Sequence, residues 1–243
     1  MSGDFQAPCA DRVFDGGDMD CGSGLILLLR QHLMETPEGG VLEMRSSEPT
    51  VEDELPPWCR MVGHEYLGTV RDGERHWRHF LRRLADEAAQ LQEDKQKARD
   101  YEWRLRLRAT GNRAATAYCR NFSFAVGQPA SFDESDDHPS AVEYAVAALA
   151  ADLLNGFSTQ ARQLGLDIED IECSAKARLD DVLAHLGLSE GDPSLSVIDL
   201  TLFVTSPEKG DVLRAAWDTV RHRSPLLRTL RKACTINERL AIL

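Results

Sequence analysis

The sequence has no Cys-x-x-Cys pair, and its six cysteines are scattered along 243 residues, at positions 9, 21, 59, 119, 173 and 234. A zinc ribbon or a thioredoxin-type site needs paired cysteines, and a disulfide-stapled secreted scaffold needs a denser set. The sequence therefore argues against these classes. It predicts no metal site and no cofactor, and it leaves isolated thiols, most of which we expect to be inert.

Long apolar runs and an excess of basic residues are also missing. No run reaches the length of a membrane span, and Met1-Ser2-Gly3-Asp4 lacks the basic region followed by an apolar run that a signal peptide needs, so we expect none. The formal net charge is −12, from 40 acidic and 28 basic residues. Such a surplus of acid argues against nucleic acid or an anionic membrane as the main partner. We therefore predict a cytoplasmic protein with no membrane or nucleic-acid partner, and its length predicts two domains.

The segment Asp18-Met19-Asp20-Cys21-Gly22-Ser23-Gly24 precedes an apolar run that starts at Leu25. This pattern predicts a turn into a helix N-terminus, with Asp20 or Ser23 as the N-cap. Backbone N–H groups and the positive end of the helix dipole stabilise a thiolate at such a position. Cys21 is therefore a candidate nucleophile or sulfur carrier. The alternative is an inert small residue at a tight turn.

The first third of the chain predicts a small two-layer α/β sandwich over residues 12–83. Residues 1–11 show no periodicity and predict a flexible tail. The pattern then indicates the order βαβαββ, with strands over 12–14, 41–46, 64–70 and 75–81 and helices over 25–34 and 50–62. Pro56 and Pro57 fall inside the second helix and are expected to distort or interrupt it.

Two motifs in this region resemble the TusA/SirA-like sulfur-carrier family over about residues 11–82. They are Cys21-Gly-Ser-Gly-Leu-Ile-Leu-Leu-Leu-Arg30 and Trp58-Cys59-Arg60-Met61, the latter followed by Gly63-His64-Glu65-Tyr66-Leu67. In that family a Cys-Pro-x-Pro motif opens the first helix, and its cysteine carries a persulfide to an acceptor protein. The resemblance assigns this role to Cys21. Both prolines are missing here, and counting back from Arg30 places the family's cysteine at Gly22.

Cys59 is the second candidate catalytic thiol, and Arg60 and Ser23 are candidate binding residues of the same site. A cationic neighbour lowers a thiol pKa, whereas a helix C-terminus raises it. Burial as a small hydrophobic residue is the favoured alternative for Cys59. His64 has no second histidine at helical spacing, so we expect it to be hydrogen-bonded and not to bind a metal.

Residues 84–101 predict a solvated helical linker, because their apolar stripe is too narrow for a core. Residues 102–243 predict a second domain with strands over 102–109, 113–120, 121–127, 169–180, 194–205 and 235–243 and helices over 140–164 and 207–223. The long helix is almost wholly apolar from Ala141 to Leu154 and is expected to be buried on most sides. Glu143 and Asp152 are its exceptions, so each must find a partner or reach the surface.

This order of elements resembles the OsmC/Ohr-like family over about residues 102–243, together with Pro139-Ser-Ala-Val-Glu143 and Arg223-Ser224-Pro225-Leu226. Hydroperoxide reductases of that family use one cysteine in the central helix and another in a Cys-Pro step, and they form an intertwined homodimer. Those two positions match Asp152 and Ser224, and Glu143 matches a helix carboxylate of the family. The resemblance implies an α+β domain that has a long buried central helix and forms a homodimer. Because Asp152 and Ser224 stand at the two cysteine positions, the domain lacks the peroxidatic cysteines. Cys119, Cys173 and Cys234 are expected to be packing residues.

Three functions remain open at this point. The favoured one is a cysteine-based sulfur carrier, in which Cys21 takes part in a persulfide relay between a sulfur donor and an acceptor protein. The second is a thiol-dependent hydroperoxide reductase or redox protein that uses Cys21 and Cys59, or thiols across a dimer. The third is a non-enzymatic dimeric module that binds a small ligand through Asp152, Ser224 and Glu143. A hydrolase based on Ser224 is disfavoured, because no base is visible near it.

Overall fold

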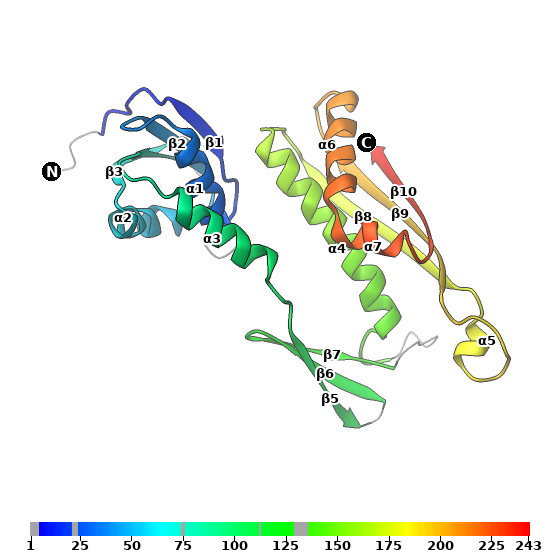
Figure 1. Cartoon of the computed structure of the whole chain (residues 1–243). Coiled ribbons are helices and arrows are strands. Elements are labelled where there is room, and N and C mark those ends of the chain that lie inside the picture. Colours follow the sequence, from blue (N-terminus) through cyan, green and yellow to red (C-terminus); the bar gives the residue numbers. More distant parts are fainter. Residues whose placement is uncertain (1–4, 21–23, 74–75, 112, 129–135) are drawn as a thin grey trace. The chain divides into compact units, whose positions relative to one another are not determined.

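The computed structural model describes residues 5–20, 24–73, 76–111, 113–128 and 136–243. The chain divides into two compact units, Met1–Glu102 and Trp103–Leu243 (Figure 1). Each unit has its own cluster of buried apolar side chains. The chain is therefore an α+β protein with two hydrophobic cores.

The first unit is built on a four-stranded sheet in the order β1-β2-β4-β3. Strand β1 is parallel to β2, and the other pairs are antiparallel. The expected βαβαββ order is confirmed, and a further helix, α3, follows it. The elements are β1 (Arg12–Asp15), α1 (Leu25–Glu35), β2 (Val41–Ser46), α2 (Val51–Val62), β3 (Glu65–Arg71), β4 (Trp77–Arg82) and α3 (Ala88–Arg99).

The core of the first unit follows from two sequence periods. Leu25, Leu29 and Leu33 recur every four residues on α1 and are fully buried. Leu42 and Met44 alternate along β2 on the face that meets them. Packing of α1 on the sheet fixes where the N-terminus of this helix lies.

Helix α2 is continuous although it contains Pro56 and Pro57, so the expected interruption is wrong. Two prolines remove two backbone donors from the helix. The buried face of α2, with Val51, Leu55 and Trp58, outweighs that loss, because tertiary packing supplies most of the stability of a short helix.

The N-terminal segment contacts the sheet of the first unit through Phe5. The ring centroids of Phe5 and Phe80 are 5.8 Å apart. A Cβ on Gly68 would lie 2.6 Å from the Phe5 ring, so the glycine makes room for this contact. Phe80 is fully buried, and the Phe5 ring is one of the groups that pack against it.

The second unit contains two three-stranded sheets, β5-β6-β7 and β10-β9-β8. The predicted order of long elements is confirmed, while the short helices α5 and α7 were not predicted. The elements are β5 (Leu105–Gly111), β6 (Ala114–Cys119), β7 (Phe122–Val126), α4 (Ala141–Gln163), β8 (Asp170–Leu179), α5 (Val182–His185), β9 (Leu195–Thr205), α6 (Gly210–Arg223), α7 (Pro225–Leu230) and β10 (Thr235–Ile242).

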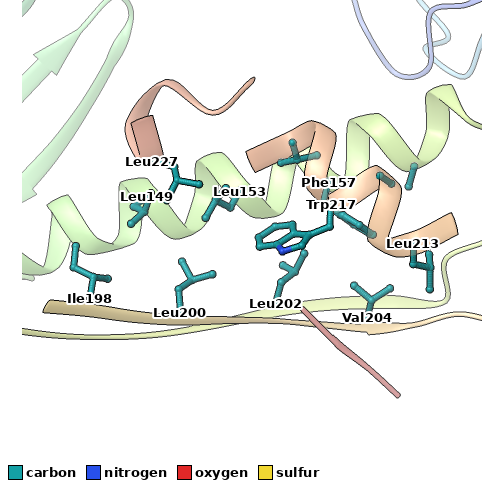
Figure 2. Close-up of a cluster of buried hydrophobic side chains, with 13 residues drawn as sticks. Leu149, Leu153, Phe157, Ile198, Leu200, Leu202, Val204, Leu213, Trp217 and Leu227 are labelled. Carbon is teal, nitrogen blue, oxygen red and sulfur yellow. The ribbon is translucent and has the colours of Figure 1, made fainter. Parts of the chain in front are cut away.

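Helix α4 is the central element of the second core (Figure 2). Leu149, Leu153 and Phe157 project from it toward Leu200 and Leu202 of β9. Trp217 of α6 packs edge-on against Phe157, with ring centroids 6.3 Å apart. These contacts fix the distance between α4 and α6, and the groove described below lies along both.

The opposite side of α4 is open in this single chain. Ala141, Ala145, Ala147, Ala148 and Ala151 are exposed. The expected burial on most sides therefore holds for one face of the helix only. A helix that is apolar around most of its circumference normally has a partner on each face.

Candidate functional site

The residue at the N-cap of α1 is not one of the two that the sequence predicts. Cys21, Gly22 and Ser23 lie outside the described residues. Gly24 occupies the N-cap position with φ 101°, a left-handed conformation that favours glycine, and a glycine has no side chain with which to cap the helix. The Gly24 carbonyl accepts from the N–H groups of Leu27 (3.1 Å) and Leu28 (3.2 Å). The predicted cap Asp20 therefore does not hold this position, and the predicted cap Ser23 lies outside the described residues. The first-turn N–H groups of α1 follow Cys21 closely in sequence.

Cys59 lies in the core of the first unit and is fully buried. Burial, together with the negative charge of Glu87, raises the pKa of Cys59 to about 12. Since the thiolate is the nucleophile, a thiol that stays protonated at neutral pH is a poor one. Arg60, the next residue, is exposed.

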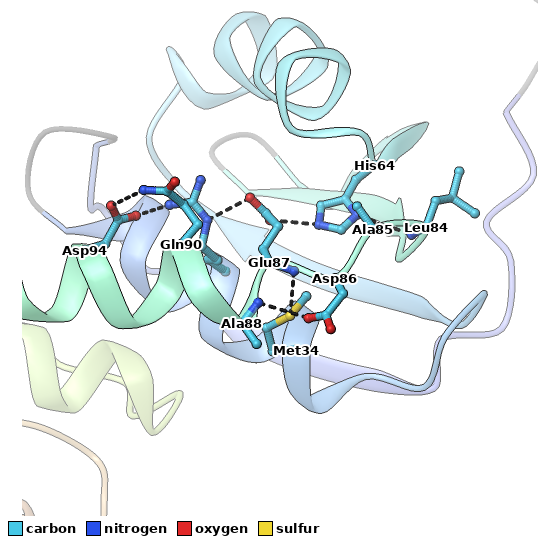
Figure 3. A network of polar contacts seen from close by, with 10 residues as sticks. Met34, His64, Leu84, Ala85, Asp86, Glu87, Ala88, Gln90 and Asp94 are labelled. Carbon is cyan, nitrogen blue, oxygen red and sulfur yellow. Dashed lines mark hydrogen bonds and ion pairs between the residues drawn. The ribbon is translucent and has the colours of Figure 1, made fainter.

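A polar network joins α1, α3 and the loop before α3 (Figure 3). The Arg30 Nε donates to Glu87 Oε1 at 2.9 Å, and Arg30 also pairs with Asp94 of α3. The guanidinium lies 5.7 Å from the Trp58 ring centroid. Only 7% of the Arg30 side chain and 8% of the Glu87 side chain are exposed, so the ion pair is shielded from water.

His64 is part of the same network. Its Nδ1 accepts from the backbone N–H groups of Leu84 (3.2 Å) and Ala85 (3.3 Å). The Nε2 therefore carries the proton of the neutral ring and donates to Glu87 Oε2 at 2.8 Å. This arrangement agrees with the expected hydrogen-bonded histidine. It attaches the segment before α3 to the end of α2.

His79 is a second buried histidine of the first unit. Its Nδ1 lies 3.1 Å from the Tyr66 hydroxyl, and its Nε2 has no hydrogen-bond partner among the described residues. Burial lowers the pKa of His79 to about 4, and burial raises the pKa of Tyr66 to about 12. Both side chains are therefore neutral at pH 7.

In the second unit, Asp152 and Ser224 meet although 72 residues separate them. The Ser224 hydroxyl donates to Asp152 Oδ2 at 2.5 Å, and the Leu226 N–H donates to the same oxygen at 3.2 Å. Ser224 is also the N-cap of α7, since its Oγ accepts from the Leu227 N–H at 3.0 Å. The carboxylate thus holds the start of α7, where Pro225 takes the first helical position. Neither of the two contacting side chains is a thiol.

A groove of about 510 Å³ runs along α4 beside this pair. Its polar lining comes from the Asp152–Ser224 pair and from Asn155, Thr159, Gln160, Gln163 and Arg223. The Arg223 Nη1 donates to Gln160 Oε1 at 3.1 Å. The groove thus combines one carboxylate, one guanidinium and several amides, which suits a small polar ligand.

Glu143 does not join the Asp152–Ser224 pair. It lies nine residues from Asp152 on α4, or about 13 Å along the helix axis. It forms a capping box with Ser140, in which its Oε2 accepts from the Ser140 N–H at 2.6 Å. This hydrogen bond lowers the pKa of Glu143.

The remaining described cysteines differ in exposure, and the metal-ligating residue types form no cluster in the described part of the chain. Cys119, Cys173 and Cys234 are half-buried, and Cys9 is exposed. No group of three or more His, Cys, Asp or Glu side chains that could hold a metal lies within the described ranges. None of the helices described is long and apolar enough to cross a membrane.

Comparisons with known proteins agree with this division into two units. Residues 134–239 match the OsmC-like protein family. The N-terminal part is similar to the sulfur carrier protein TusA of Pseudomonas entomophila (strain L48), with 28% identity over 76 residues, or 31% of this chain and 92% of that protein. TusA of Pseudomonas putida (strain GB-1) matches to the same extent.

The crystal structure of an OsmC like protein from Mycoplasma pneumoniae superposes on the chain with a TM-score of 0.52. It shares 17% sequence identity and covers 59% of this chain and 99% of that one. At this identity the likeness concerns the fold. The chain therefore joins a TusA-like N-terminal region to an OsmC-like C-terminal domain.

Arg30, Glu87 and Asp94 were not predicted as a group. Only Arg30 carried a signal, since it is a charged residue directly after five apolar residues of α1. Its acidic partners lie 57 and 64 residues further along the chain, and helix periodicity gives no information on such distant pairs.

Proposed function

We propose that this protein is a sulfur carrier and that Cys21 holds the transferred sulfur as a persulfide. The observation that carries the proposal is the similarity to the sulfur carrier TusA over 92% of the length of that protein. The N-cap of α1 adds support, because Gly24 has no side chain to occupy the N-terminal end of the helix, and Cys21 lies three residues before it in the sequence. The proposal places the carrier in the cytoplasm, where thiols stay reduced.

The proposed step is an exchange at sulfur. The Cys21 thiolate attacks the outer sulfur of a donor protein persulfide, so that a new S–S bond forms and the S–S bond of the donor breaks. The donor cysteine leaves as a thiolate, and the proton of the persulfide stays with the transferred sulfur. A sulfur acceptor then takes the outer sulfur from Cys21 in the same way. No net oxidation occurs, and no metal or cofactor is required.

Loading of the carrier can be measured as releasable sulfide. In a Cys9→Ser background, which removes the exposed thiol of Cys9, the protein is incubated with a small-molecule persulfide donor and desalted. Dithiothreitol is then expected to release stoichiometric sulfide from this parent and from its Cys59→Ser variant, but none from its Cys21→Ser variant. Cys59→Ser is the matched control, because it removes a thiol that is buried. Equal release from the parent and its Cys21→Ser variant would rule out Cys21 as the carrier. A bound small ligand with unmodified Cys21 would favour the binding-module function, with the Asp152 groove as its site.

We further propose that the OsmC-like domain forms a homodimer. In the β5-β6-β7 sheet, Leu105, Leu107, Phe122 and Phe124 lie on one face and are 38–58% exposed. The exposed alanines of α4 form a second uncovered apolar surface. Strand β8 pairs on one side only within the described sheets. Its other edge exposes the backbone hydrogen-bonding groups of a ten-residue strand, which can pair with a strand of another chain. A second copy covers all three features.

The proposed dimer can be tested by substituting alternate residues of β5, because neighbouring side chains of a strand lie on opposite faces of the sheet. Leu105→Glu/Leu107→Glu is expected to give a monomer, because charges on the apolar face prevent its burial. Arg106→Glu/Arg108→Glu, on the opposite face of the same strand, is expected to leave the dimer intact. Light scattering after size-exclusion chromatography measures both masses. A monomeric wild type would disprove the dimer.

The same domain gives no support for peroxide reduction as the main activity. The two positions that the family resemblance relates to reactive cysteines hold a carboxylate and a hydroxyl in direct contact. A peroxidatic step needs a thiolate at the site of attack. We propose instead that this domain supplies dimerisation and a polar groove.

A further inference from the structure

The segment 103–128 has a charge unlike that of the rest of the chain. It contains five arginines, Arg104, Arg106, Arg108, Arg113 and Arg120, and no acidic residue. The whole chain carries a net charge of −12. Such clustering of arginines in one sheet is not expected from the overall acidic composition, so we ask what these arginines bind.

Strand register sorts this segment into two different faces. Arg106 pairs with Tyr118, and Tyr118 pairs with Ser123 on the next strand. Arg108 pairs with Thr116. Directly paired residues share a face, and side chains alternate along each strand. These paired side chains therefore lie opposite the apolar face that we assign to the dimer. We call them the basic face, which consists of Arg106, Arg108, Thr116, Tyr118 and Ser123.

The two arginines of the basic face, Arg106 and Arg108, are exposed. All seven residues of β5 are exposed. The Arg106 guanidinium lies over the Tyr118 ring, 4.9 Å from its centroid, which restricts its motion. Neither Arg106 nor Arg108 makes an ion pair or hydrogen bond with another residue in the described part of the chain. Their hydrogen-bonding capacity is therefore unused.

The chemistry of the basic face selects its ligand. Its polar groups are guanidinium donors and hydroxyls, with no carboxylate to accept from a cationic partner. Arg106 and Arg108 are two residues apart on one strand, which places their Cα atoms about 6.6 Å apart. Carboxylates at alternate positions of an extended segment have the same spacing, and each guanidinium can bind one of them with two hydrogen bonds.

We propose that the basic face is a docking surface for an acidic segment of a partner protein. A protein segment fits better than nucleic acid, because the net charge of −12 repels a long polyanion while a short row of carboxylates meets only the local positive charge. The proposal does not depend on Cys21. It adds a surface on the OsmC-like domain through which partner proteins are recognised.

A simpler role for these arginines is solubility, since charged side chains on an exposed strand prevent edge pairing between sheets. The two roles differ in their dependence on the sign of the charge. Glutamate in place of arginine keeps a charged strand but repels carboxylates. Charge reversal therefore separates docking from solubility.

The test uses the full chain and a fluorescein-labelled peptide of alternating Glu and Thr, with fluorescence anisotropy as the readout. We expect the wild type to bind the peptide and Arg106→Glu/Arg108→Glu to weaken binding by about tenfold or more. Arg106→Lys/Arg108→Lys keeps the charge and is expected to retain part of the affinity. The matched control is Arg99→Glu/Arg214→Glu, two exposed arginines on helices, with affinity within about twofold of the wild type.

Three results would overturn the proposal. They are the absence of peptide binding to a folded, dimeric wild type, equal loss of affinity in both charge-reversal variants, and tighter binding of a single-stranded RNA of matched length than of the peptide. The last result would assign the surface to nucleic acid. Light scattering on each variant verifies that the dimer persists, so a change in affinity reports the surface itself.

Discussion

Replacing Arg30 by methionine is expected to lower the free energy of unfolding of the first unit by about 3 kcal/mol. The variant leaves Glu87 buried without its cation and removes the ion pair between α1 and Asp94 of α3. Removing one partner of a buried pair is costly, because the remaining charge has already lost its water. The measurement is native-state hydrogen exchange of the α1 amides in the full chain.

Two variants distinguish the loss of the buried Arg30–Glu87 ion pair from the effect of removing any arginine side chain. Arg60→Met, in the last turn of α2, removes an exposed guanidinium and is expected to change stability by less than about 0.5 kcal/mol. Arg30→Met/Glu87→Gln removes both charges, keeps an acceptor for the buried His64 Nε2 and is expected to recover most of the loss. If Arg30→Met behaves like Arg60→Met, the network does not stabilise the contact between α1 and α3.

The first unit is also expected to lose stability in acid because of His79. The pKa of this histidine is about 4 in the folded unit and about 6.5 in the unfolded chain. Between these values the unfolded chain binds a proton that the folded unit does not bind. The His79 contribution is therefore fully present above pH 6.5 and is lost as the pH falls toward 4. At about 1.4 kcal/mol for each pH unit, the total loss is about 3 kcal/mol.

Carboxylates also titrate in this range, so the wild type must be compared with His79→Gln. Glutamine keeps an acceptor for the Tyr66 hydroxyl but does not titrate. Urea unfolding at pH 7 and pH 4, followed through the amide signals of β4, gives the difference between the two proteins. We expect this difference to change by about 3 kcal/mol in favour of the variant at pH 4. A constant difference would show that His79 is not the group responsible.

Periodicity in the sequence was sufficient for most elements of the fold. Spacing of four at Leu25, Leu29 and Leu33 placed α1, and alternation along residues 41–46 placed β2. It was misleading at Pro56 and Pro57, since local propensity contains no information about the core that keeps α2 helical. It also missed α7, whose start depends on a contact between Ser224 and a residue 72 positions earlier.

The candidate sites were predictable to different degrees. The pairing of Asp152 with Ser224 agrees with the family resemblance, which relates both positions to one site, and periodicity alone could not place them together. Arg30, Glu87 and Asp94 form a contact that depends on how α3 packs, and no local pattern encodes it. The basic face was not predicted. The sequence predicted a strand over 102–109, but the register with β6 was needed to identify the residues that share a face with Arg106 and Arg108.

The most direct test of the central claim is to locate the transferred sulfur. The wild type is loaded with a persulfide donor, capped with an alkylating reagent and digested, and each cysteine peptide is weighed by mass spectrometry. We predict one additional sulfur atom on the peptide that contains Cys21 and none on the peptides that contain Cys59 or Cys173. Sulfur on another cysteine, with Cys21 alkylated directly, would contradict the account.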